Sequence, residues 1–197
     1  SHVAILKCDH TQGEAAPVLS SEVIEIFAES GASVEWYDIE ESNASTSRRS
    51  QLYAVQADGS ELRICGATLT NGTTRNDYSV DASGDHTFTR LSAMAIGSDS
   101  QHIDNASDIR HTGNNGRSDQ LFKYVLDGEA TGAFGGSIVV AHGARFVDMP
   151  AQADIGLGFF KEFAHGSRAH VNIARDDVTG AVLGRIVRNQ HGVGVLA

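Results

Sequence analysis

Three side chains in one short stretch have the types and the spacing of a metal site. His102, Asp104 and His111 form the pattern H-x-D-x6-H, which offers a metal two imidazoles and a carboxylate if neighbouring turns of the fold stack them together. The alternative is structural: Asp104 and Asn105 cap a corner, and the histidines bond to local carbonyls. We favour the structural alternative and keep the three residues as metal candidates. An iron–sulfur cluster fits less well, because cysteine usually holds such clusters and none lies nearby.

Other residues in the chain have the types that occur in catalytic sites. Ser118 joins His111 and Asp104 as the three residue types of a hydrolase triad, but no G-x-S-x-G turn surrounds the serine. Arg75 and Asp77 stand two residues apart, so in a strand they share a face and can form a ladder with neighbouring strands. We therefore expect no catalytic residue.

The glycine-rich segment 132–137, GAFGGS, would suit phosphate binding if it preceded a helix. Here it leads into the apolar residues 138–140, and no Lys-Ser or Lys-Thr pair follows. We expect these glycines to allow close backbone packing between layers of a fold instead.

Composition excludes several classes of function. The chain has 197 residues, enough for one sizeable core, and 25 acidic against 15 basic residues give a net charge of -10. This charge disfavours nucleic acid and anionic membranes as partners. No apolar run approaches the ~18 residues of a spanning helix and no secretory signal is evident, so we expect a cytoplasmic protein. Ser1 and His2 suggest a tag remnant, which leaves 3–197 as one domain.

The two cysteines, Cys8 and Cys65, form neither a C-x-x-C motif nor a disulfide framework. We expect both to be small buried thiols.

The elements that must position all these residues are short strands. Glycine is abundant (21) and proline scarce (2), and apolar alternating runs such as 23–26, 34–39 and 52–55 end at Gly, Asn or Asp corners. Two architectures suit this pattern, an antiparallel sandwich or barrel and a parallel β-helix. The composition leaves both open. Segment 118–126, SDQLFKYVL, fits either a helical turn or a strand.

Several longer segments, taken in order, are similar to one known family. EVIEIFAESGASVEWYDIEES, NGTTRNDYSVD, HIDNASDIRH, SDQLFKYVLDGEATGAFGGSIVV and IARDDV resemble the SufD branch of the SufB/SufD family, which belongs to the Suf iron–sulfur cluster assembly system. The resemblance extends over roughly residues 8–152 and more faintly to about residue 187. It implies an all-β fold, a right-handed parallel β-helix.

The sequence departs from the family pattern after IARDDV. The family continues there with a Cys and, two residues on, a His-Gly pair at the SufB–SufD interface. Without gaps, those positions hold Gly180, Val182 and Leu183. The helical amino-terminal region of the family is also missing, and Ala197 ends the sequence before any helices that bind SufC.

The resemblance implies a SufD-like scaffold core without catalytic activity. Its expected partners are a SufB-like subunit or a second copy, through an exposed sheet edge, and SufC only if carboxy-terminal helices are present in the full protein. No cofactor is expected in the isolated chain, although a transient iron–sulfur cluster fits a complex. The main alternative is an engineered or diverged β-solenoid without activity, and a weaker one is a sandwich-fold ligand binder.

Overall fold

The computed structural model describes residues 1–11, 16–70, 72–149, 151–157, 168–175, 182–189 and 192–196. Side chains are described for 1–11, 16–69 and 72–149. The strands of the described residues are β1 (His2–His10), β2 (Val18–Ala28), β3 (Ser33–Glu41), β4 (Thr46–Gln56), β5 (Glu61–Thr70), β6 (Thr73–Ala82), β7 (Phe88–Gly97), β8 (His102–His111), β9 (Arg117–Leu126), β10 (Thr131–Val140), β11 (Ala151–Leu157), β12 (Arg168–Arg175), β13 (Val182–Asn189) and β14 (Gly192–Leu196). No helix occurs among these residues.

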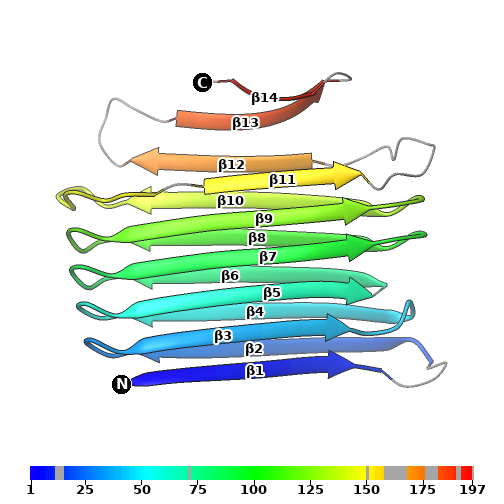
Figure 1. Cartoon of the computed structure of the whole chain (residues 1–197), viewed down its shortest axis with the longest axis horizontal. Helices are drawn as coiled ribbons and strands as arrows, with labels where there is room; N and C mark the ends of the chain where they lie inside the picture. Colours follow the sequence, from blue (N-terminus) through cyan, green and yellow to red (C-terminus); the bar gives the residue numbers. More distant parts are fainter. Residues whose placement is uncertain are drawn as a thin grey trace.

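The strands wind into a parallel β-helix with two sheets (Figure 1). One sheet has the order β1-β3-β5-β7-β9-β11, and the other begins β2-β4-β6-β8-β10-β12. Neighbours in these series pair in parallel, so that Ser33, Glu61, Phe88 and Arg117 mark one level on four stacked strands. The expected all-β parallel β-helix is confirmed, and the parallel ladders exclude the sandwich alternative.

The chain departs from this winding at its carboxy-terminal end. β12 pairs with β13 in the antiparallel sense, and β13 pairs with β14 in the same way. β12, β13 and β14 are therefore consecutive antiparallel neighbours in one sheet. Every earlier connection between strands crosses to the other sheet.

The core lies between the two sheets, because alternate residues of each strand point inward. Leu62, Ile64, Leu91, Ile103 and Ile109 are among the side chains that are fully buried there. Segment 118–126 belongs to strand β9, with its even-numbered residues buried and its odd-numbered residues facing outward. A period of two, as in a strand, thus resolves the ambiguity of this segment.

Glycines at the corners let successive turns stack closely. A Cβ atom on Gly84 would lie 2.2 Å from the backbone of Ala57, and one on Gly113 would lie 2.0 Å from the carbonyl oxygen of Gly84. In segment 132–137 the close neighbours are different: a Cβ on Gly132 would lie 2.9 Å from side-chain atoms of Tyr124 and Leu126. The expected close packing is present at Gly132, but against side chains of the opposite sheet instead of backbone, and a Cβ on Gly135 would meet nothing within 4 Å.

The prediction that both cysteines are buried is wrong. Cys8 and Cys65 are exposed, because each occupies an outward position of its strand, between residues that point inward. Cys8 follows Lys7, whose partner Asp38 is buried, and Cys65 follows the buried Ile64. A one-residue difference in position reverses the face of the sheet on which a side chain lies.

The amino-terminal residues take part in the fold. His2 begins β1 and pairs with Ser33, whose N–H donates to the carbonyl oxygen of Ser1. Within the described part of the chain, no helix has the length and apolar character needed to cross a membrane.

Candidate functional site

The three metal candidates of the sequence lie on one strand but not at one place. His102 and Asp104, near the start of β8, face outward, whereas His111, at its end, faces inward and is fully buried. Nine residues of extended chain span roughly 30 Å, so one ion cannot contact both histidines. His102 Nδ1 lies 2.6 Å from the Thr131 hydroxyl oxygen, and Asp104 forms an ion pair with Arg75. Across the described side chains, no group of three His, Cys, Asp or Glu residues is arranged to hold a metal ion.

The structural alternative for this stretch also needs correction. Asp104 and Asn105 lie within β8 and do not cap a corner. Asn105 is buried: its amide accepts a hydrogen bond from the Asn76 amide at 3.0 Å and donates to the Tyr124 hydroxyl at 2.6 Å. Because buried polar groups need partners, this residue serves to join three strands inside the coil.

Two members of the supposed triad do meet, in the closed interior. His111 Nε2 lies 2.9 Å from Ser118 Oγ, and both residues are 0% exposed. Burial lowers the pKa of His111, so the imidazole is neutral at pH 7. Its Nδ1 atom has no hydrogen-bond partner, and Asp104 lies on the other face. Both side chains are closed to solvent, and none of the described carboxylates is hydrogen-bonded to the His111 ring.

The predicted Arg–Asp ladder is confirmed on the outer face of the sheet that contains β4, β6 and β8. Arg75 bridges Asp77 at 2.6 Å on its own strand and Asp104 on β8, and Arg49 of β4 lies 3.4 Å from Asp77. These partly exposed contacts link three neighbouring strands, but each surface pair contributes little to stability.

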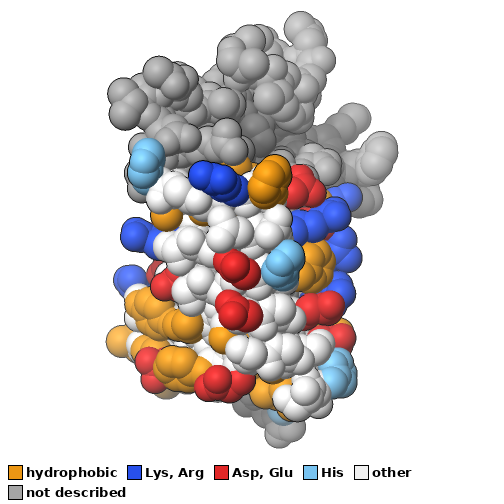
Figure 2. Space-filling view, turned by 90° about the vertical axis from the view of Figure 1, so that its left-hand side faces the viewer, with side chains coloured by type: hydrophobic (Ala, Val, Ile, Leu, Met, Phe, Trp, Pro, Cys, Tyr) orange, Lys and Arg blue, Asp and Glu red, His pale blue; other side chains and the backbone are white. Residues whose placement is uncertain are grey.

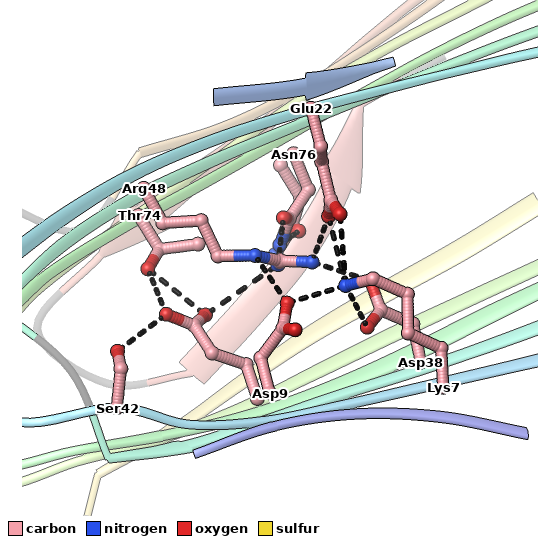
Figure 3. A network of polar contacts seen from close by, with 10 residues as sticks. Lys7, Asp9, Glu22, Asp38, Ser42, Arg48, Thr74 and Asn76 are labelled. Carbon is pink, nitrogen blue, oxygen red and sulfur yellow. Dashed lines mark hydrogen bonds and ion pairs between the residues drawn. The ribbon is translucent and has the colours of Figure 1, made fainter. Parts of the chain in front are cut away.

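Among the described side chains, a large cluster of charged residues lies inside the first turns of the coil, and none of its members was a candidate from the sequence. It joins inward-facing residues of β1, β2, β3 and β4, and we call it the amino-terminal network: Lys7, Asp9, Glu22, Asp38, Glu40 and Arg48. Figure 3 shows the guanidinium of Arg48 crossing the interior between Glu22, Asp9 and Asp38, with Asn76 and Thr74 beside it.

Arg48 is the centre of the amino-terminal network. Its guanidinium donates to Asp38 at 2.7 Å and to the Asn76 side-chain oxygen at 2.9 Å, and it also contacts Glu22. Glu40 lies 3.6 Å away. Burial by itself would lower the pKa of Arg48, but the charges of Asp38, Glu40 and Glu22 outweigh it and raise the pKa. The guanidinium therefore stays charged although it is almost completely buried.

Glu40 is the most deeply placed carboxylate of this network. It is 1% exposed and accepts hydrogen bonds of 2.9 Å from the hydroxyls of Ser42 and Thr74. Burial raises the pKa of Glu40, although Arg48 and the two hydroxyls act in the opposite direction. Its ionised form is thus less favourable here than in water.

Lys7 connects the outermost strand to the network. Its ammonium group lies 2.9 Å from Glu22 and 3.5 Å from Asp38, and it contacts Asp9. Burial alone would lower the pKa of Lys7, but the hydrogen bonds to Asp9 and Glu22 raise it. A protonated amine is not a nucleophile. The network therefore holds charges of both signs inside the first turns of the coil.

The phase of the strands was the signal that could have revealed this network. With Ile24 and Ile26 inward, Glu22 must also point inward, and with Leu52 and Ala54 inward, Arg48 must do the same. The apolar runs 23–26 and 52–55 are recognisable in the sequence as strands, and the same period of two continues into the charged residues that precede them.

The family model for "SUF system FeS cluster assembly, SufBD core domain" matches residues 1–154. The chain belongs to the SufB/SufD core family. A search of curated proteins finds no match to the sequence. The matched residues of this SufB/SufD core include the whole amino-terminal network, strands β1 to β10 and the first part of β11.

The three positions at which the sequence departs from the family pattern lie outside the described side chains. Gly180 lies outside the described residues, and Val182 and Leu183 belong to β13, for which only the backbone is described. The loss of the Cys and His of the SufB/SufD pattern therefore stays a prediction from sequence.

Proposed function

We propose that this chain is a SufD-like scaffold subunit of the cytoplasmic Suf assembly system and has no catalytic activity of its own. The observation that supports this proposal most is the SufBD core match over residues 1–154, which covers β1 to β10 and the first part of β11 of the parallel coil. Two further features agree with a scaffold. The described polar clusters are engaged in internal contacts, and stacked strands give a stiff platform with open sheet edges for a partner.

The partner we propose is a SufB-like subunit, and the nascent iron–sulfur cluster is cargo of the complex. His102 and Asp104 are the metal candidates on the outer surface, but they already contact Thr131 and Arg75. We infer that stable cluster binding requires ligands from the partner, because cysteines are the usual ligands and the two in this chain lie on β1 and β5, away from β8.

The first test is a binding assay of the folded chain with purified SufB and, separately, with purified SufC. We expect SufB to be retained by the immobilised chain. A circular dichroism spectrum typical of β-sheet must accompany the assay, so that failure to fold is not mistaken for failure to bind. Retention of neither protein by the folded chain would refute the SufD-like role.

The second test is anaerobic reconstitution with iron and sulfide. We expect no stoichiometric cluster absorbance from the isolated chain, and such absorbance when SufB is included. His102→Ala tests the outer metal candidate, and His86→Ala, at an exposed corner, is the matched control. If the isolated chain gives a cluster that only His102→Ala removes, the requirement for a partner is wrong.

A further inference from the structure

The outer face of the sheet that contains β4, β6 and β8 has a hollow of about 320 Å³. It is lined by Arg49 and Tyr53 of β4, Asp77 and Ser79 of β6, and Ala106 and Asp108 of β8. β2 and β10 continue the sheet on either side of these strands, so the hollow lies within the face and not at an edge. Its volume is at the lower end of the range for ligand sites, which suits one side chain better than a whole cofactor.

Three residues at one level of the sheet give the hollow its shape. Tyr53 is level with Ser79, and Ser79 is level with Asp108. Neighbouring strands lie about 4.8 Å apart, so the backbones of β4 and β8 are roughly 10 Å apart, with the small side chain of Ser79 between them. The Tyr53 ring, which is 46% exposed, and the Asp108 carboxylate therefore stand on opposite sides of a low floor.

The low floor continues beyond β8. Ala106 is level with Gly135 of β10, where a Cβ atom would meet nothing within 4 Å. A side chain that enters the hollow from a partner thus has room to lie flat on the sheet.

The charged groups that line the hollow differ in whether they have partners. Arg49 lies 3.4 Å from Asp77, which also pairs with Arg75 at 2.6 Å. These three residues belong to the Arg–Asp ladder. Asp108 is exposed and forms no hydrogen bond or ion pair with any described residue. The ladder therefore does not account for Asp108, and this carboxylate is available to a ligand.

The charge of the whole chain favours a cation as that ligand. The net charge is -10, which attracts cationic partners at long range. Figure 2 shows acidic, basic and uncharged side chains interspersed on the side of the coil that lies to the left in Figure 1. Where both signs are mixed in this way, the contacts with individual carboxylates decide the place at which a cation binds.

A guanidinium group matches both walls of the hollow. It is planar, it stacks on aromatic rings, and it donates paired hydrogen bonds to a carboxylate, whereas an ammonium group is a compact charge without this geometry. The same three groups meet elsewhere in this chain. The guanidinium carbon of Arg63 lies 4.9 Å from the centre of the Phe88 ring, and the guanidinium lies 3.4 Å from the Glu61 carboxylate.

We propose that the hollow between Tyr53 and Asp108 is a binding site for an arginine side chain of another protein. The guanidinium stacks on the Tyr53 ring above Ser79 and donates hydrogen bonds to the Asp108 carboxylate, and the aliphatic part of the arginine lies over Ala106. This proposal rests on the geometry of β4, β6 and β8 and not on the proposed function.

The test is a titration of the isotope-labelled full chain with the peptide acetyl-Gly-Arg-Gly-amide, followed by amide chemical shifts in NMR spectroscopy. We expect saturable shifts centred on β4, β6 and β8 at millimolar peptide concentrations, because one side chain supplies only part of an interface. The matched probe carries citrulline, which has nearly the same shape as arginine and no charge. It should bind about fivefold more weakly, and the corresponding lysine peptide should also bind more weakly than the arginine peptide.

Variants of the chain locate the peptide on the surface. Tyr53→Leu and Asp108→Asn should each weaken binding of the arginine peptide by about two- to fivefold. Asp108→Asn should also reduce the difference between the arginine and citrulline peptides, an effect that a merely structural role of Asp108 would not produce. The controls are Tyr37→Leu, at an exposed tyrosine of the other sheet, and Glu129→Gln, at an exposed corner. Both should leave binding unchanged, and circular dichroism checks that all four variants fold.

Several outcomes would overturn the proposal. They are the absence of saturable shifts, shifts centred on other strands, equal binding of the arginine and citrulline peptides, and control variants that weaken binding as much as Tyr53→Leu and Asp108→Asn. Tighter binding of the lysine peptide would overturn the assignment to arginine, because stacking and paired hydrogen bonds would then not determine the choice of ligand.

Discussion

The interior of this coil has two regions that share one backbone geometry and differ in what fills them. In the first turns the inward positions hold the amino-terminal network, centred on Arg48 and Glu40. In the middle turns the positions level with Arg48, Asp38 and Glu40 hold Ile103, Phe122 and Tyr124, which are buried. A parallel β-helix thus accommodates both a charged and an apolar filling at the same positions.

The two fillings should respond differently to the loss of one side chain. An apolar residue removed from the middle turns leaves a cavity whose cost depends on the lost contacts. A charged residue removed from the network leaves its partners buried without compensation, and that penalty exceeds the net contribution of the intact pair. Single substitutions can therefore separate the two regions, and pH can as well.

The largest effect is expected for Arg48→Ala. Without the guanidinium, Asp38 and Glu40 remain buried with too little positive charge nearby, and we expect a loss of about 3–5 kcal/mol in the free energy of unfolding. Urea unfolding followed by circular dichroism measures it. Arg49→Ala is the matched control, since Arg49 is the next residue on β4 but its side chain is 58% exposed. We expect its effect to stay below about 1 kcal/mol. Similar losses from both variants would contradict the role of the network.

Leu91→Ala should produce the next largest effect, in the apolar middle. Leu91 is 0% exposed on β7, and truncation of a buried leucine costs about 2–5 kcal/mol, of which we expect roughly 3. The loss should not change with salt concentration, because no charge is involved. Met94→Ala on the same strand, where the side chain is exposed, should cost less than about 1 kcal/mol. A cost for Leu91→Ala as small as that of Met94→Ala would show that the middle turns are loosely packed.

The sequence predicted the overall fold better than it predicted the interior. Alternation around Leu52 and Ile64 located strands, but it left a sandwich and a parallel coil open. The parallel coil was implied by the resemblance of segments such as HIDNASDIRH and SDQLFKYVLDGEATGAFGGSIVV to the SufB/SufD family. The alternation continues into the polar residues that flank the apolar runs. Arg48 and Glu22 therefore point inward, although neither was predicted to do so. Cys65 was predicted to lie inside, whereas the same alternation places it outside.

The three metal candidates do not lie together, and the reason is the parity of their spacing. H-x-D-x6-H places His102 and His111 nine residues apart, an odd number, so in a continuous strand they must lie on opposite faces. Sequence spacing alone does not show whether a corner interrupts the strand between them, and here β8 continues from His102 to His111. The pairing of His111 with Ser118 depends on how β8 and β9 face each other across the coil, which no local pattern indicates.

The smallest expected effect comes from pH and distinguishes the network from the rest of the interior. Burial raises the pKa of Glu40 above its ordinary value of 4.5, so the folded state binds a proton more tightly than the unfolded state. The contribution of Glu40 to the free energy of unfolding is therefore fully present below pH 4.5. It is lost as the pH rises through the pKa of Glu40 in the folded state. Glu40→Gln has no such titration, and we expect its stability relative to the wild type to increase as pH rises from 4.5 to 7.

Urea unfolding of both proteins at several pH values measures this difference. Glu25→Gln, at an exposed outward position on β2, is the control for replacing a glutamate outside the network. If the Glu40→Gln difference instead decreases as pH rises, the Arg48 charge and the hydroxyls of Ser42 and Thr74 outweigh burial. The network would then stabilise ionised Glu40. The charged first turns and the apolar middle turns would differ only in how much free energy of unfolding is lost when one side chain is removed.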